Sequence, residues 1–156
     1  MKITFKGDYT LKSLIDIGLY QKKGPVSLKE ISERNDIPLK YLEQIFIGLK
    51  KAGLVRSKRG KEGGYMLAVP ADEITVGKII RLSEGTLRPI KCIRPDSSRD
   101  LPIEEHQPCS YEGICAMKKL WKKVNNAISN IVDETTLLDL IEETEEMKKD
   151  FHYYHI

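Results

Sequence analysis

Residues 54–69 constrain the fold of this chain more than any other segment. Leu54–Lys58 and Tyr65–Val69 each have the short apolar pattern of a β-strand, and the intervening residues 60–64 include three glycines. Two strand patterns joined by a glycine-rich turn predict a β-hairpin. The other periodic segments of the chain are helical, so we expect a mainly α-helical protein with one small hairpin.

Three helical patterns precede this hairpin. Residues 8–21 and 39–52 each place their apolar side chains on one face of a helix. Between them, Ser27 stands three residues before Glu30 in the pattern of a capping box, which predicts a short helix over 28–34. This order of elements is that of a winged helix-turn-helix domain, in which the helix 39–52 would enter the major groove of DNA.

The domain is expected to occupy residues 1–85. A cysteine-containing loop is expected over 86–111, because four of the seven prolines fall there. A long helix and a short return helix are expected over 112–142, followed by an acidic tail over 143–156.

The long helix has an apolar seam that suits pairing with a second copy of the chain. Its apolar residues recur at alternating spacings of three and four, as in a coiled coil. Twenty residues of helix extend about 30 Å, which is too long for a small domain to cover alone. We therefore expect a homodimer with an interface formed by Met117, Leu120, Trp121, Val124, Ala127, Ile128 and Ile131.

Charge is divided unevenly along the chain. Residues 1–91 contain 18 Lys and Arg against 10 Asp and Glu, whereas residues 92–156 contain 8 against 13. A basic N-terminal part predicts a polyanionic partner, here double-stranded DNA. On the outward face of the helix 39–52 we expect Lys40, Tyr41, Glu43, Gln44 and Gly48. The full set of candidate DNA-binding residues is Ser27, Lys40, Tyr41, Glu43, Gln44, Lys50, Lys51, Lys58, Arg59 and Lys61.

Several classes of protein are not expected. No apolar run approaches the roughly 18 residues that span a bilayer, so no membrane partner is predicted. Residues 1–6 lack the apolar stretch of a secretory signal, which favours a cytoplasmic location. The sequence contains no catalytic triad, P-loop or dinucleotide fingerprint, so an enzyme is not expected.

The three cysteines form the second candidate site. Cys92, Cys109 and Cys115 are an odd number, which cannot form a closed disulfide framework. Thiolates are the usual ligands of iron–sulfur clusters, and three of them leave one ligand to be supplied by another residue. Two alternatives remain open: the thiols are structural, or they bind zinc together with His106.

Seven segments resemble the IscR/NsrR-type family of bacterial winged helix-turn-helix regulators. They are residues 3–9, 24–34, 41–45, 49–55, 59–60 together with 63–67, 74–80 and 136–140, and the three cysteines add to the match. The resemblance implies a homodimeric transcription regulator that binds an imperfectly palindromic operator and often holds an iron–sulfur cluster. It also implies that Tyr41, Glu43 and Gln44 lie on the recognition helix and that Arg59 lies on the wing.

The resemblance further suggests the fourth ligand of a cluster. One subgroup of the family has a histidine three residues after the third cysteine, where this chain has Lys118. Another subgroup uses an aspartate in the first helix of the partner subunit, and Asp8 stands at the matching position. His106 is the competing candidate for the fourth ligand. Asp8 could instead serve only as the N-cap of its helix, a position at which aspartate is favoured. The spacing between Cys92 and Cys109 is longer than is usual in the family.

We therefore predict a homodimeric regulator whose affinity for its operator is controlled by a labile iron–sulfur cluster, 2Fe–2S or 4Fe–4S. The predicted ligands are Cys92, Cys109, Cys115 and Asp8. An alternative within the family is a cluster-free regulator controlled by a partner protein or by thiol oxidation. A small iron–sulfur electron carrier is a more distant alternative, which the basic N-terminal part disfavours.

Overall fold

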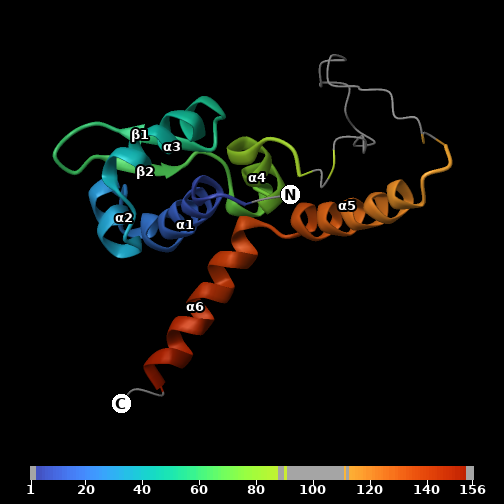
Figure 1. Ribbon diagram of the computed structural model, residues 1–156. Coiled ribbons are helices and arrows are strands. Elements are labelled where there is room, and N and C mark those ends of the chain that lie inside the picture. The colour runs from blue at the N-terminus through green and yellow to red at the C-terminus, as the bar shows by residue number, and fades with distance from the viewer. Residues whose placement is uncertain (1–2, 88–89, 91–110, 112, 154–156) are drawn as a thin grey trace.

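The computed structural model describes residues 3–87, 90, 111 and 113–153 (Figure 1). Its elements follow in the order α1 (Phe5–Tyr20), η1 (Gln21–Lys23), α2 (Leu28–Asn35), α3 (Leu39–Lys51), β1 (Val55–Lys58), β2 (Gly64–Leu67), η2 (Ala71–Glu73), α4 (Val76–Glu84), α5 (Ala116–Glu134) and α6 (Leu137–Tyr153). The predicted fold class, mainly helical with one small hairpin, is confirmed.

The first three helices and the hairpin share one apolar core. Each contributes fully buried side chains, because the apolar residues of each helix fall on one face. The Phe46 ring of α3 packs edge-on against Tyr65 of β2, with ring centroids 4.6 Å apart. The core residues of these elements are Leu14, Ile17, Ile31, Leu42, Ile45, Phe46, Leu49, Val55 and Leu67.

Local interactions fix both ends of α2, the short helix before the turn to α3. The Ser27 hydroxyl accepts a hydrogen bond from the Glu30 amide at 3.2 Å, and the Glu30 carboxylate accepts one from the Ser27 amide at 2.8 Å. The predicted capping box is therefore present, and hydrogen bonding from the Ser27 hydroxyl lowers the pKa of Glu30. At the other end of α2, Asp36 takes the left-handed conformation with φ of 52°, which turns the chain towards α3.

The hairpin is anchored at its base. In the antiparallel pair β1–β2, Val55 lies opposite Leu67 and Lys58 lies opposite Gly64. The backbone of Val26 both donates to and accepts from the backbone of Tyr65, at 2.9 and 2.7 Å. The segment before α2 thus pairs with β2 through an isolated bridge at Val26. The hairpin β1–β2 and its turn form the wing, and the tip of the wing extends away from the helices (Figure 1).

Helix α4 connects α1 to α5. The Glu84 carboxylate accepts hydrogen bonds from the Thr4 amide at 3.0 Å and from the Gly7 amide at 2.8 Å. Its bond with the Thr4 hydroxyl is the main cause of a lowered pKa of Glu84. One turn earlier in α4, the Arg81 guanidinium forms a two-pronged ion pair with Asp133 of α5. The start of α1 and the end of α5 are therefore both held by the last turn of one short helix.

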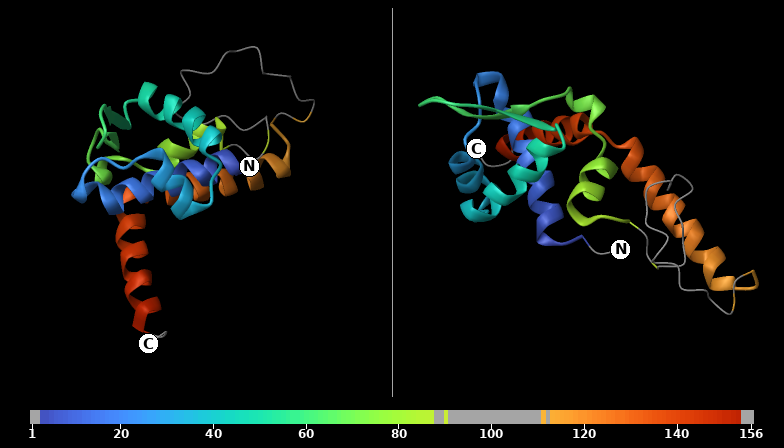
Figure 2. Two further views of the ribbon diagram at one scale, coloured as in Figure 1. Left: turned by 90° about the vertical axis from the view of Figure 1, so that its left-hand side faces the viewer. Right: turned by 90° about the horizontal axis from the view of Figure 1, so that it is seen from above.

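Helices α5 and α6 extend from the body in different directions (Figures 1 and 2). The expected return helix is longer than predicted, since α6 continues to Tyr153 through the segment expected to be an acidic tail. Its first two turns bury Leu137 and Ile141, and Ile141 lies so close to Gly18 that a side chain on Gly18 would collide with it. Runs of glutamate are good helix formers, which explains why the acidic composition did not end the helix.

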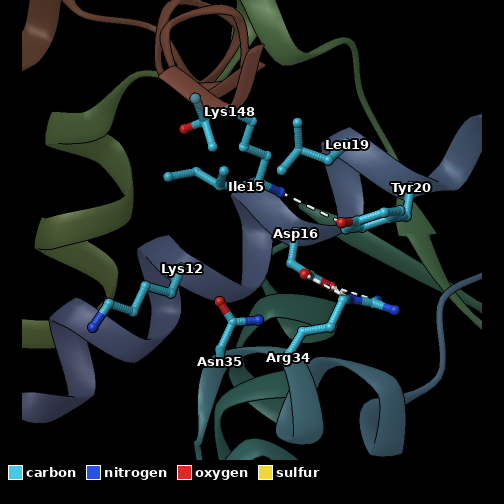
Figure 3. Close-up of a pocket in the computed structure, with 9 residues that line it drawn as sticks. Lys12, Ile15, Asp16, Leu19, Tyr20, Arg34, Asn35 and Lys148 are labelled. Atoms are coloured by element: carbon cyan, nitrogen blue, oxygen red, sulfur yellow. Dashed lines mark hydrogen bonds and ion pairs between the residues drawn. The ribbon is translucent and has the colours of Figure 1, made fainter. Parts of the chain in front are cut away.

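A buried ion pair holds α2 against α1. Asp16 of α1 is 6% exposed and accepts hydrogen bonds from the Arg34 guanidinium at 2.7 and 2.9 Å (Figure 3). The same guanidinium lies over the Tyr20 ring, 4.2 Å from its centroid, while Lys148 of α6 reaches the Tyr20 hydroxyl at 3.4 Å (Figure 3). These residues line a pocket of about 360 Å³ between α1, α2 and α6. Because its Asp16 and Arg34 already satisfy one another, we interpret the pocket as structural.

Arg34→Met is expected to destabilise the fold by about 2–3 kcal/mol, because it leaves the Asp16 carboxylate buried without its partner; the loss is below the ~3–5 kcal/mol of a fully buried pair because the Arg34 side chain is 30% exposed. Urea denaturation followed by circular dichroism measures the loss. Lys29→Met in the exposed Lys29–Glu33 pair is the matched control and should change stability by less than about 0.5 kcal/mol. Equal stability of Arg34→Met and the control would show that the pair contributes nothing.

Candidate nucleic-acid interface

The outward face of α3 is polar and charged. Lys40, Glu43, Gln44, Lys50 and Lys51 are all exposed. The opposite face is buried in the core, so the helix cannot rotate to hide these side chains. Gln44 and Glu43 have the hydrogen-bonding groups that recognise adenine and cytosine in the major groove. The helix thus presents base-reading groups between cations.

Two residues of α3 differ from the expectation. Tyr41, expected on the outward face, is half-buried, because its ring packs edge-on against Tyr9 of α1 with centroids 5.6 Å apart. Ile47 was not among the candidates, yet it is 70% exposed. Its spacing of three residues from Gln44 would have placed it on the same face.

The wing adds a second group of cations. Lys58 at the end of β1 is exposed, as are Arg59 and Lys61 in the turn. The Lys50 ammonium donates a hydrogen bond to the Ser57 hydroxyl at 2.9 Å, which links the end of α3 to β1. Ser27 is half-buried and its hydroxyl is engaged with Glu30, so in this structure it supports the start of α2. The cations of α3 and of the wing are therefore presented by two elements that contact one another.

The apolar seam of α5 is largely uncovered within one chain. Met117, Leu120 and Ile131 are 55%, 51% and 65% exposed. Ala127 is also exposed, while Trp121, Val124 and Ile128 are half-buried. Of the whole helix, only Asn125 is fully buried.

The structure describes part of the candidate cluster site. Cys115 is a free, partly exposed thiol at the N-cap of α5. Cys92, Cys109 and His106 lie outside the described residues. Among residues 3–87, 90, 111 and 113–153, no three His, Cys, Asp or Glu side chains gather as a metal site.

Asp8 lies in the first turn of α1. The cap of that helix is Thr4, whose hydroxyl accepts from the Lys6 amide at 3.2 Å, so the interpretation of Asp8 as an N-cap is wrong. The Asp8 carboxylate is 46% exposed and pairs with Lys12 at 2.8 Å. It is therefore accessible to a group outside its own chain.

A helix-turn-helix with an exposed polar third helix, followed by a cationic wing, defines a winged helix-turn-helix protein of the DNA-binding class. The family model for Rrf2, described as an iron-dependent transcriptional regulator, matches residues 3–143. The chain belongs to the Rrf2 family of transcriptional regulators, and its relatives are not enzymes. The predicted resemblance is confirmed. None of the helices that the structure describes is long and apolar enough to cross a membrane.

Two kinds of regulator are similar to this chain. The regulator CymR of Bacillus subtilis is 36% identical over 154 residues, covering 99% of each chain. IscR of Aliivibrio salmonicida is 37% identical over 145 residues, covering 93% of this chain and 80% of that protein. Among solved structures, CymR, described as the global cysteine regulator of B. subtilis, has a TM-score of 0.72 at 36% identity, covering 92% of this chain and 98% of that one. IscR of T. potens also has a TM-score of 0.72, at 35% identity, covering 94% and 90%.

Proposed function

We propose that this regulator binds a palindromic DNA operator as a homodimer, with α3 in the major groove and the wing on the adjacent backbone. The observation that carries this proposal is the exposure of Lys40, Gln44, Lys51, Lys58 and Arg59 on α3 and the wing, two elements joined by the Lys50–Ser57 hydrogen bond. Cations at this density suit a phosphate backbone, and the side chains between them suit base edges. The exposed seam of α5 supports dimerisation, because a single chain leaves it in water.

Gln44→Ala and Arg59→Ala should have different effects on DNA binding. Loss of Gln44 removes a base contact, so it should relax specificity at one position per half-site and cost about 1–3 kcal/mol there. Loss of Arg59 should weaken binding and reduce any preference for A·T pairs beside the half-site. Gel-shift titrations on a panel of operator variants measure both effects. If both variants bind every duplex like the wild type, α3 is not the helix in the groove.

We further propose that a labile iron–sulfur cluster controls operator affinity. The proposed ligands are Cys92, Cys109 and Cys115 of one subunit and Asp8 of the other. The donor set that the structure describes fits such a group, since Cys115 offers a partly exposed thiol and Asp8 an accessible carboxylate. The iron-dependent description of the matched family supports it as well. When bound, the cluster would supply redox chemistry and a group that can be gained or lost.

The packing around Asp8 offers a route from such a site to α3. The neighbouring Gly7 amide is held by Glu84, which ties the start of α1 to α4. Tyr9, the next residue after Asp8, packs against Tyr41 of α3. Binding of a cluster to the Asp8 carboxylate would break its ion pair with Lys12. A resulting shift of the first turn of α1 would then change the Gly7–Glu84 and Tyr9–Tyr41 contacts. The coupling is thus proposed to pass through the first turn of α1.

Anaerobic purification tests the cluster proposal. Cys115→Ser should abolish the visible absorbance of the purified protein, whereas Asp8→Ala should leave a cluster that forms but is lost faster. Lys12→Ala is the matched control, because it removes the partner of Asp8 and keeps the carboxylate. If His106→Ala destroys the cluster while Asp8→Ala has no effect, the fourth ligand is His106.

The similarity to CymR, a cysteine regulator, favours a second candidate. In that case the protein holds no cluster, and a partner protein or thiol oxidation controls it. Protein prepared without oxygen would then contain no iron, or zinc instead, and its DNA binding would survive. Metal analysis of the same preparation therefore separates the two candidates.

A further inference from the structure

Ile47 lies in the middle of the outward face of α3. It is 70% exposed, more than Leu39 at the start of the same helix (42%), whereas Leu42, Ile45, Phe46 and Leu49 are buried. The residue that follows, Gly48, has no atom within 4 Å of where a side chain would start. The described part of the chain therefore leaves most of the Ile47 side chain in solvent.

The spacing along α3 places Ile47 between cations. Lys40, Gln44, Ile47 and Lys51 follow one another at intervals of four, three and four residues, so they form one line along the helix. Eleven residues of helix extend about 16 Å, and the major groove is about 12 Å wide. With α3 in the groove, Lys40 and Lys51 reach towards the phosphates while Gln44 and Ile47 lie over the base edges.

An isoleucine over base edges has one apolar partner. The major-groove edges of the bases present hydrogen-bond donors and acceptors, and the apolar group among them is the 5-methyl of thymine. A purine edge would leave polar groups facing a hydrocarbon side chain without hydrogen bonds, which is unfavourable, and a cytosine edge offers only a C5–H in place of the methyl group. The chemistry of the position therefore selects thymine.

We propose that Ile47 contacts the 5-methyl group of one thymine in each operator half-site and so contributes to sequence specificity. This inference rests on the proposed binding of DNA by α3. It adds an apolar contact to the polar readout by Glu43 and Gln44, and it assigns a role to a side chain that the packing of the protein does not use.

Replacement of thymine by deoxyuridine tests the contact directly, because only the methyl group is lost. A duplex is first selected from a random library with the wild-type protein. Each thymine is then replaced in turn, and affinities of the wild type and Ile47→Ala are measured by gel shift. At one position per half-site the wild type should lose about 4-fold for each methyl removed, and Ile47→Ala should lose nothing further.

The Ile47→Ala variant should fold normally, because the side chain is exposed and alanine is the better helix former. Ile47→Val should keep part of the sensitivity to deoxyuridine. Equal sensitivity of the wild type and Ile47→Ala at every thymine would overturn the inference. In that case, loss of binding by Lys51→Ala would show that α3 still enters the groove. Failure of the wild type to enrich any duplex would overturn the proposed function and this inference with it.

Discussion

Leu120→Glu is expected to convert the dimer into monomers and to lower operator affinity by about 10²–10⁴-fold. Leu120 lies in the exposed apolar seam of α5, where the proposed interface would bury its side chain against the partner. A carboxylate buried there without a hydrogen-bonding partner is strongly unfavourable. Two linked half-site contacts give a large gain in affinity through effective concentration, and a monomer loses that gain. Analytical ultracentrifugation and gel shift measure the two effects.

Asn126→Glu is the matched control for this variant. Asn126 is exposed on the side of α5 away from the seam, and the substitution adds the same negative charge. It should leave both the dimer and the DNA affinity unchanged. A wild type that sediments as a monomer, or a Leu120→Glu protein that remains dimeric, would contradict the proposed interface.

Raising salt from 50 to 200 mM should weaken DNA binding by at least about 10³-fold. The α3 face and wing present enough cations for a dimer to contact six or more phosphates, among them Lys40, Lys51, Lys58, Arg59 and Lys61. Each neutralised phosphate releases counterions. A plot of the logarithm of the binding constant against the logarithm of the salt concentration therefore has a slope of about −0.9 for each phosphate contacted. Fluorescence anisotropy with a labelled duplex measures this slope.

A pair of double variants tests which cations set the slope. Lys58→Ala with Lys61→Ala removes two wing cations from each subunit, so the slope should fall by about 3–4 for the dimer. Lys119→Ala with Lys123→Ala removes the same charge from exposed positions of α5 and should leave the slope unchanged. Equal slopes for both variants would place the DNA away from the wing.

The DNA-binding half of the fold could be predicted because its signals are local. The spacing of Ser27 and Glu30 specified a capping box, and the glycines at 60–64 specified a turn. The start of α1 was predicted three residues late, because Thr4 caps a helix whose first turn has little apolar pattern. The acidic composition of residues 143–156 predicts a tail, but α6 continues to Tyr153 because glutamate favours helix.

The site was harder to predict than the fold. The exposure of Gln44 followed from helical periodicity, whereas the half-burial of Tyr41 depends on Tyr9, a residue 32 positions earlier in the chain. Ile47 was overlooked since an apolar residue in a helix is usually assigned to the core. The hydrogen bonds from the Thr4 and Gly7 amides to the Glu84 carboxylate join residues that are about 80 positions apart in the sequence. No pattern of residue spacing predicts such a contact.

The pairing of Val26 with Tyr65 has a consequence for the operators that such a dimer would accept. It fastens the wing to the start of α2, so we expect the wing and the helix-turn-helix to move together as one body. The signal proposed to pass through the first turn of α1 would then turn this body as a whole, and it would leave the contacts within a half-site unchanged. The number of base pairs tolerated between half-sites, rather than the preferred bases, is the property that such a signal would alter.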